Sequence, residues 1–453
     1  MKILKNITTT TMVMVLLLAS SLEARETKKV SNFSGSNFVE SSGTFDGNRI
    51  YADVTNNGLF LDYHISGDSA LEWPKGTGVH SIFQSALWMG ATVNGQIRTI
   101  VGDYTQDMGP GPYGGDPLAA VHRIYKVNKS MLDDPASHDD FQNWPTDWGA
   151  PWVDADGDGV YTPLPAGPDH PEFIGDQVIW FVSNDGDIAY KLNFGTDPMG
   201  VEIQTTMFGY DRIDAIGDML FVKQLVINKG GDDLVDTYMG LWSDPDLGYA
   251  GDDLVGCNVE LGMGYVWNDG GDTQYDNLDI GTPAAGYDFF QGPKVPCDDP
   301  TDTVECPAQG AKMFGTYFPG EKNLKMSSFA FYINGDATYT DPSDETEGYY
   351  YLQGLRKDGS PYPTDIAGDL YNQKFCFYGD PSLTHGSANP VDGNYAAAAD
   401  RRFLMSVGPF TMAAGDSQEV VFGIFHAAGG DALSSVSYLT QVDQLAQSAY
   451  DND

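Results

Sequence analysis

Apolar and polar residues alternate with a period of two along most of this sequence, as expected for half-buried β-strands. The clearest case is residues 201–242, where "VEIQTTMFGY", "MLFVKQLVIN" and "LVDTYMGLW" are three strand-like runs separated by turns rich in Gly and Asp. Val, Ile, Thr and Tyr dominate these runs, and such residues fit a pleated sheet. The same pattern predicts further strands at Val259–Trp267, Ser327–Asn334, Phe403–Met412 and Glu419–Ala427.

Two Asn-Gly pairs predict β-hairpins, because both residues tolerate the positive φ of a type I′ turn. Asn57-Gly58 lies within "RIYADVTNNGLFLDYHISG", and Asn94-Gly95 lies within "SIFQSALWMGATVNGQIRTIVG". Each pair is flanked by alternating segments. We therefore expect two strands around each turn.

The C-terminal segment has a different period. In "DALSSVSYLTQVDQLAQSAYDND" apolar residues recur every three or four positions, which predicts an amphipathic helix that packs on a sheet. Asp431 is a suitable N-cap. The expected fold is therefore mainly β: one or two antiparallel β-sandwiches with long loops and a C-terminal helix.

The chain divides into three parts. Residues 1–24 resemble a cleaved secretory signal, with Lys2 and Lys5 before the apolar run "MVMVLLLAS", which is too short to span a membrane. Residues 25–44 are rich in Ser and Asn and predict a flexible lead-in. A β-rich extracellular region is expected over 45–453, and two packed sub-domains with a break near 185–200 are one possible arrangement.

The charge balance narrows the classes of partner. Lys and Arg number 24 against 64 Asp and Glu, which gives a net charge of −40 and excludes nucleic acid or an anionic membrane as the expected partner. Of the acidic residues 12 are Glu and the other 52 are Asp. Asp is typical of turns and of sites for hard cations. This composition fits a loop-rich protein in a calcium-containing or saline medium.

The stretch "DADGDGVYTP" predicts a calcium loop. Asp154, Asp156 and Asp158 occupy alternate positions, a glycine follows where a sharp turn is needed, and the Val160 carbonyl comes next. The residue at the closing position is a proline instead of the bidentate Glu of an EF-hand, so another carboxylate must complete the site. Asp169, Glu172 and Asp176 are within reach, and Asp176 is preferred because it precedes the strand "QVIWFVSND". A solvated acidic turn is the alternative.

A second acidic group lies in "WSDPDLGYAGDDLVGC", where Asp244, Asp246, Asp252 and Asp253 occur close together. Their spacing matches no fixed motif. A second cation site, a catalytic carboxylate pair and a hydrogen-bonded turn all remain open.

Four cysteines in an exported chain favour disulfides over a metal site, because no Cys-x-x-Cys or neighbouring His accompanies them. Cys297 and Cys306 bracket a short polar loop, which leaves Cys257 with Cys376. Other pairings of the four are possible.

Catalytic signatures are missing from the sequence: it contains no H-E-x-x-H, G-x-S-x-G or Walker loop. The aromatic residues Trp144, Trp148 and Trp152 could form a sugar-stacking platform, although core packing is the more usual role of such residues.

Several motifs together resemble a known group of proteins. "VDADGDGVYTP", "GDQVIWFVSND", "WSDPDLGYAGDDLVGC" and "PAAGYDFFQGP" occur in this order and are followed by "VVFGIFHAAGGDALSSVSYLTQVDQLAQSAYDN". They are similar to uncharacterised secreted β-rich proteins of Bacteroidetes-like and Ignavibacteria-like bacteria. Those proteins often continue into fibronectin type III modules and a type IX secretion sorting domain, which this sequence lacks. The resemblance implies export and no established catalytic activity.

We therefore expect a secreted, non-catalytic module of the extracellular space or outer cell surface. Calcium is the expected structural cofactor, and surface assembly, adhesion or contact with glycans or other surface proteins is the expected role. The alternatives are a hydrolase of polysaccharide or protein that uses the 244–253 carboxylates, and a filament or surface-layer subunit. The sequence leaves the oligomeric state open.

Overall fold

The computed structural model describes residues 41–299, 301–363, 374–381 and 397–452. The predicted signal segment and the predicted lead-in as far as residue 40 lie outside the described residues. The lead-in was expected to extend to residue 44, but Ser42–Phe45 already forms a strand, β1.

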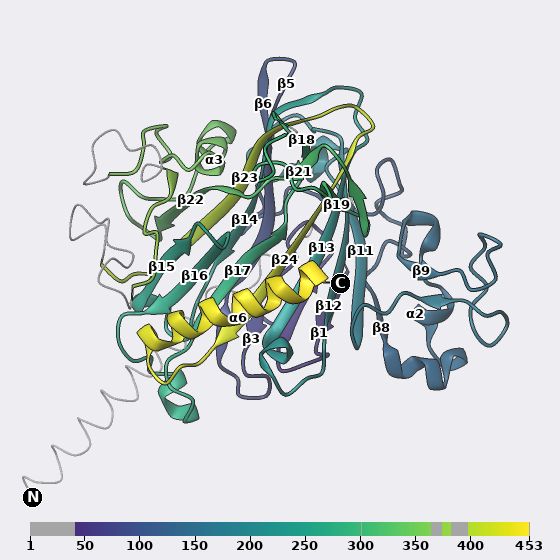
Figure 1. Ribbon diagram of the computed structural model, residues 1–453, viewed down its shortest axis with the longest axis horizontal. Helices are drawn as coiled ribbons and strands as arrows, with labels where there is room; N and C mark the ends of the chain where they lie inside the picture. Colours follow the sequence, from purple (N-terminus) through teal and green to yellow (C-terminus); the bar gives the residue numbers. More distant parts are fainter. Residues whose placement is uncertain (1–40, 300, 364–373, 382–396, 453) are drawn as a thin grey trace, which may run out of the picture.

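The larger sheet is antiparallel (Figure 1) and contains nine strands in the described residues. Its order is β15-β16-β17-β24-β13-β12-β11-β7, and β8 pairs with β11 beside β7. The strands are β7 (Gly109–Pro110), β8 (Tyr125–Asn128), β11 (Gln177–Asn184), β12 (Val201–Gly209), β13 (Met219–Asn228), β15 (Asp253–Asn258), β16 (Met263–Asn268), β17 (Ala284–Gln291) and β24 (Ser417–Ala427).

The second sheet is antiparallel in the order β22-β23-β14-β5-β6. Its strands are β5 (Gln84–Val93), β6 (Gln96–Ile100), β14 (Leu234–Asp244), β22 (Met326–Ile333) and β23 (Arg401–Met412). The turn between β5 and β6 confirms the second predicted hairpin: Asn94 and Gly95 have φ of 52° and 79°, as a type I′ turn requires.

The inner faces of the two sheets pack together as a β-sandwich, which confirms the predicted fold class. Apolar side chains from both sheets fill the space between them, including Leu241 of β14 and Phe422 of β24, both fully buried. Polar contacts also cross this core, because the Tyr287 hydroxyl of β17 is 2.5 Å from Ser85 Oγ of β5 and 3.0 Å from Ser243 Oγ of β14.

A second apolar layer covers the outer face of the larger sheet. The helix α6 (Ala432–Asn452) crosses β16, β17 and β24 there and buries Val436, Leu439 and Val442 (Figure 1). The Ser434 amide donates to the Asp431 carboxylate at 2.9 Å, so the predicted helix and its cap are confirmed. None of the helices in the described residues has the length and apolar character of a membrane-spanning segment.

Short elements complete the structure. A small sheet of β1, β2 (Tyr51–Thr55), β3 (Leu71–Glu72) and β4 (His80–Ile82) packs against the sandwich. The chain after Asn57-Gly58 turns instead of forming a second strand, so the first predicted hairpin is wrong, and β2 pairs with β1 and β3. The remaining elements are β9 (Trp152–Val153), β10 (His170–Pro171), β18 (Lys294–Pro296), β19 (Ala311–Met313), β20 (Thr316–Phe318), β21 (Glu321–Asn323), α2 (Asp139–Gln142), α3 (Glu345–Leu352) and the 3-10 turns Lys129–Asp133, Pro135–Ser137, Thr146–Trp148, Ile188–Tyr190, Ala215–Asp218, Ala250–Asp252 and Tyr275–Leu278.

The strands on either side of residues 185–200 are interleaved. β11 and β12 flank this stretch in the sequence and pair with each other over their full length. β5 comes from before the stretch and pairs with β14 from after it. Both sheets therefore combine chain segments from each side of the stretch that the sequence offered as a possible boundary.

Candidate metal centres and an adjoining groove

The predicted calcium loop projects from a narrow neck beside the larger sheet. β9 and β10 pair antiparallel at this neck, with His170 opposite Val153 and Pro171 opposite Trp152. The loop between them contains the sequence "DADGDG". The two ends of the loop are thus held together by backbone pairing, and the acidic residues occupy its tip.

The two glycines of the motif allow the backbone to curl around the Asp154 carboxylate. Gly157 and Gly159 both have φ of +76°, a conformation that residues with a Cβ rarely adopt. Their amides donate to Asp154 at 2.7 and 3.0 Å. The Asp-Gly alternation therefore directs two backbone amides at the Asp154 carboxylate, and both Asp154 and Asp156 are exposed.

Asp169 provides the closing carboxylate of this site. It is fully buried, and its two oxygens accept the amides of Ala155 at 3.0 Å and Thr162 at 2.7 Å. Asp154, Asp156 and Asp169 each present a carboxylate oxygen, and these three oxygens lie within 4.8 Å of one another. A hard divalent cation with oxygen ligands fits this donor set.

The preferred closing residue from the sequence, Asp176, is not part of this group. Its carboxylate accepts the Asp211 amide at 2.8 Å, and its backbone pairs with Gly209 and Lys129 at the start of β11. We expected β11 to hold Asp176 against the loop. Instead, β11 places Asp176 beside the far end of β12. Asp158 also lies outside the group of three and accepts the Val160 amide at 2.7 Å.

The second predicted cluster is brought together only in part. Asp244 and Asp246 lie at the end of β14, and their third partner is Asp400, which precedes β23. Carboxylate oxygens of these three residues also lie within 4.8 Å of one another. Asp252 and Asp253 instead accept the side-chain amide of Asn268 at 2.8 and 3.2 Å.

Burial dominates the electrostatics of this second cluster. Burial raises the pKa of Asp244 to about 6, although the Arg402 guanidinium 3.0 Å away opposes the shift. Burial also raises the pKa of Asp253 well above its usual range, and the charge of Asp246 adds to the effect. Asp244 and Asp253 are thus enclosed in the protein, away from any surface that a polymeric substrate could reach.

The cysteines form one disulfide. Cys297 and Cys306 are bonded across their short loop, as predicted. Cys257 and Cys376 are buried neighbours held as thiols: Cys257 Sγ donates to the Cys376 carbonyl at 3.7 Å and Cys376 Sγ to the Phe329 carbonyl at 3.3 Å. The second predicted disulfide is therefore not formed in this structure, although the sequence correctly paired two residues that lie side by side.

A groove of about 820 Å³ runs across the outer face of the larger sheet. Its floor consists of side chains from β12 and β13, with Phe208 and Phe221 stacked at 5.3 Å and Tyr210 edge-on to Phe221 at 5.9 Å. Pro151 and Glu172 form one wall. They lie immediately outside the neck of the acidic loop and are joined by a backbone hydrogen bond of 3.0 Å.

Basic and acidic side chains both line the groove: Arg212, Lys223 and Lys312 with Glu172 and Glu419. Lys223 extends from the middle of β13 into it, and no carboxylate of the described residues is within ion-pair distance of this lysine. Lys312 lines the opposite wall and donates to the Tyr450 carbonyl at 3.1 Å. An apolar aromatic floor with an available ammonium group suits a ring-shaped ligand that carries an acidic group.

The three tryptophans near the loop pack within the protein. Trp144 is buried and donates to the Pro151 carbonyl at 2.9 Å, Trp148 lies edge-on to His122, and Trp152 lies edge-on to Tyr161. They support the wall of the groove from behind.

No protein-family model matches this chain, and a search of curated proteins finds no match either. Residue geometry therefore has to carry the functional argument. Sequence reasoning named Asp169 as reachable but preferred another residue, and it missed Asp400 and the groove. Asp400 is brought to Asp244 by sheet pairing across more than a hundred residues, which the spacing of acidic residues does not reveal.

Proposed function

We propose that this protein is a secreted, non-catalytic extracellular module that binds an acidic glycan in the groove and uses calcium to hold one groove wall in place. The observation that carries the proposal is the continuity between the acidic loop and the groove. The chain leaves the groove at Pro151, passes through the loop, and returns to the groove at Glu172.

Calcium in the loop would act through the position of this wall. Asp154, Asp156 and Asp169 would supply the ligands, and the bound cation would neutralise carboxylates that otherwise repel one another. The loop tip and the buried Asp169 would then move as one unit with the β9–β10 neck. Rigid walls favour binding, because a site that is already ordered loses less conformational entropy when the ligand arrives.

The groove chemistry supports an acidic carbohydrate as the ligand class. A sugar ring presents apolar C–H groups that stack on aromatic side chains such as Tyr210 and Phe221. A uronate carboxylate would pair with Lys223, which has no carboxylate partner among the described residues. In a chain with a net charge of −40, a lysine without a carboxylate partner is a distinctive contact for an anionic ligand.

The calcium part of the proposal is tested by thermal unfolding of the mature chain with calcium and with chelator. Calcium at about a hundred times its dissociation constant should stabilise the fold by about 2.7 kcal/mol. The double variant Asp154→Asn with Asp156→Asn should lose the part of this shift that comes from the loop. Asp68→Asn is the matched control, because Asp68 is exposed and belongs to neither acidic group. This variant should retain the calcium-dependent shift. A wild-type unfolding curve that calcium does not move would reject the site.

The glycan part is tested by affinity electrophoresis in gels containing hyaluronan, a uronate polymer, with neutral dextran as the reference gel. Hyaluronan should retard the wild type in the presence of calcium, and Lys223→Ala should abolish the retardation. Lys75→Ala removes an exposed lysine elsewhere and should leave it unchanged. Equal mobility of wild type and Lys223→Ala in hyaluronan would contradict the assignment of the groove.

A further inference from the structure

The second acidic group lies where two neighbouring strands meet a loop. Asp244 ends β14, Asp400 immediately precedes β23, and Asp246 follows in the loop after β14. Their nearest carboxylate oxygens are within 4.8 Å of one another. Calcium–oxygen distances of about 2.3–2.6 Å place opposing ligands about twice that far apart, so the spacing suits one ion between them.

An independent observation comes from the carboxylate of Asp244, whose residue is 1% exposed. Its Oδ2 accepts the Tyr104 hydroxyl at 2.6 Å and the Arg402 guanidinium at 3.0 Å. Its Oδ1 is buried, and no donor from the described residues reaches it. A buried carboxylate oxygen with no partner is costly, and a bound cation would remove that cost.

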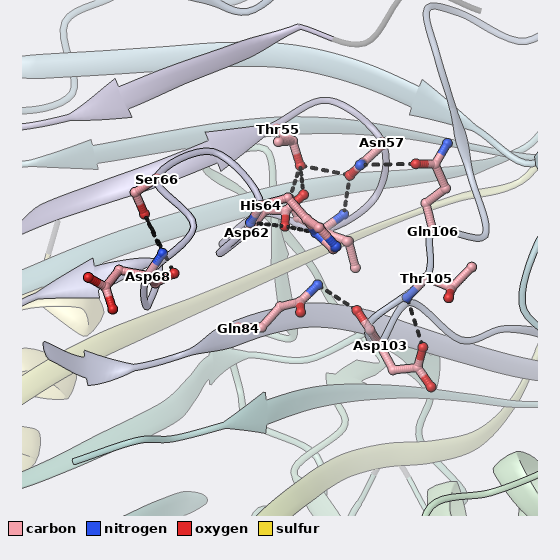
Figure 2. Close-up of polar contacts among 11 residues, drawn as sticks. Thr55, Asn57, Asp62, His64, Ser66, Asp68, Gln84, Asp103, Thr105 and Gln106 are labelled. Atoms are coloured by element: carbon pink, nitrogen blue, oxygen red, sulfur yellow. Dashed lines mark hydrogen bonds and ion pairs between the residues drawn. The ribbon is translucent and has the colours of Figure 1, made fainter. Parts of the chain in front are cut away.

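The residue opposite Asp244 in the sheet also has a buried oxygen without a hydrogen-bond donor. Gln84 of β5 pairs directly with Asp244 in the sheet, so the two side chains extend on the same side. Figure 2 shows the Gln84 amide nitrogen directed at the Asp103 carbonyl, which it reaches at 2.5 Å. The amide oxygen of Gln84 is left buried without a donor in the described residues. Side-chain amide oxygens are ordinary calcium ligands.

Cationic and neutral donors hold the group in position. The guanidinium of Arg402 donates to Asp400 at 2.6 Å and to Asp244 at 3.0 Å. Asn334 Nδ2 donates to the second oxygen of Asp400 at 2.8 Å, so Asp400 is held in position by neutral and cationic donors together.

We propose that Asp244, Asp246 and Asp400 bind a second divalent cation of the calcium class where β14 ends and β23 begins, in the middle of the five-stranded sheet. The ion would take the free Asp244 oxygen and join the loop after β14 to the segment before β23. This site is separate from the loop at residues 154–169, and it does not depend on the function proposed for that loop.

The test uses terbium, a luminescent substitute for calcium, in a variant that lacks the loop site, Asp154→Asn with Asp156→Asn. Tyr104 and Trp242 lie next to Asp244, with their rings 5.8 Å apart, so excitation of these side chains should produce terbium emission. Calcium added across about 10⁻⁵ to 10⁻² M, which covers the range of extracellular sites, should displace the terbium and quench the emission.

Adding Asp246→Asn and Asp400→Asn to this variant should weaken terbium binding on the order of 100-fold or more, since two ligands are removed. Adding Asp68→Asn and Asp133→Asn, two exposed acids, provides a control with the same change in charge and should leave the emission unchanged. Emission that survives the 246/400 substitutions, or that is absent from the start, would overturn the proposal.

A second measurement avoids altering the site. In the variant that lacks only the loop site, calcium should slow amide hydrogen exchange at residues 245–247 and 397–400 relative to chelator. Unchanged exchange in both segments would also overturn the proposal. Loss of calcium binding at the 154–169 loop with protection retained here would reject the function proposed above and leave the second site standing.

Discussion

Replacing Asp443 with Asn should make the protein more stable at neutral and alkaline pH. Asp443 of α6 and Asp288 of β17 face each other across the interface between helix and sheet, and both are fully buried. Each carboxyl group is within hydrogen-bonding reach of the other, and the backbone of Phe289 lowers the pKa of Asp288 by less than burial and Asp443 raise it. Such a pair has to share a proton, because two adjacent buried charges repel strongly.

The size of the effect follows from the titration of this pair. Burial raises the pKa of Asp288 well above its usual range, and the facing Asp443 adds to the shift, so Asp288 keeps its proton and donates it to Asp443. Burial raises the pKa of Asp443 from 3.8 to about 7. The pair as a whole therefore takes up a negative charge near neutrality.

A folded-state pKa above the unfolded value gives stability that is fully present below about pH 4 and is lost as pH rises towards 7. The shift of Asp443 corresponds to an upper bound of about 4 kcal/mol at pH 8. Asp451, exposed at the end of the same helix, adds a smaller repulsion, and Tyr450 stays neutral because burial raises its pKa.

The assay is urea unfolding at fixed, saturating calcium from pH 5 to pH 8, followed by tryptophan fluorescence. Asp443→Asn should unfold at higher urea than the wild type at pH 8, and the difference should shrink towards pH 5, where Asp443 is protonated. Asp451→Asn makes the same chemical change on the exposed part of α6 and should shift the midpoint only slightly. A variant no more stable than the wild type at pH 8 would refute the shared-proton reasoning.

Three further outcomes follow from the packing. Asp169→Asn should destabilise the protein by about 1–3 kcal/mol even in chelator, because Asp169 accepts two backbone amides. Asp156→Asn should have no such effect. Urea unfolding in chelator compares the two variants. Cys297→Ser with Cys306→Ser should cost about 2–3 kcal/mol and speed amide exchange in β18 and β21, while exchange in β24 provides the reference. Leu439→Ala should cost about 2–5 kcal/mol and loosen α6, whereas Leu445→Ala, which is half exposed, should cost much less; equal losses would contradict the packing of α6.

The local sequence pattern predicted those strands and turns whose own residues determine their conformation. Strands β12, β13, β14 and β23 alternate clearly, and the hairpin at Asn94-Gly95 depends on backbone preferences of those two residues. β17 was missed because its sequence, "AAGYDFFQ", contains glycine and an acid at positions facing the helix. A Cβ at Gly286 would lie 3.0 Å from Leu439 Cδ2, so the glycine allows close packing of α6, which the local sequence does not show.

The candidate sites were predicted only as far as they are local. Asp154 and Asp156 follow from their spacing with the glycines, and the structure groups them as expected. Asp169 was hard to choose because the turn that folds it back depends on its own bonds to Ala155 and Thr162. Asp400 could not be found from spacing, because the pairing of Ser243 with Phe403 brings it to Asp244.

The buried acidic residues of this chain fall into two classes: some accept hydrogen bonds from backbone amides, and others do not. The second class indicates the candidate functional positions. Asp185 accepts the amides of Met199 and Val201, and Asp272 accepts those of Gln274 and Tyr275. Carboxylates of this kind fasten loops and need no further partner. Asp244 Oδ1 has no such donor among the described residues, and the Asp288–Asp443 pair depends mainly on the proton that its two carboxyl groups share. A cation can neutralise the first because Asp246 and Asp400 converge on it, whereas the second is neutralised by the proton that it shares, so calcium should act at Asp244 and not at the Asp288–Asp443 pair.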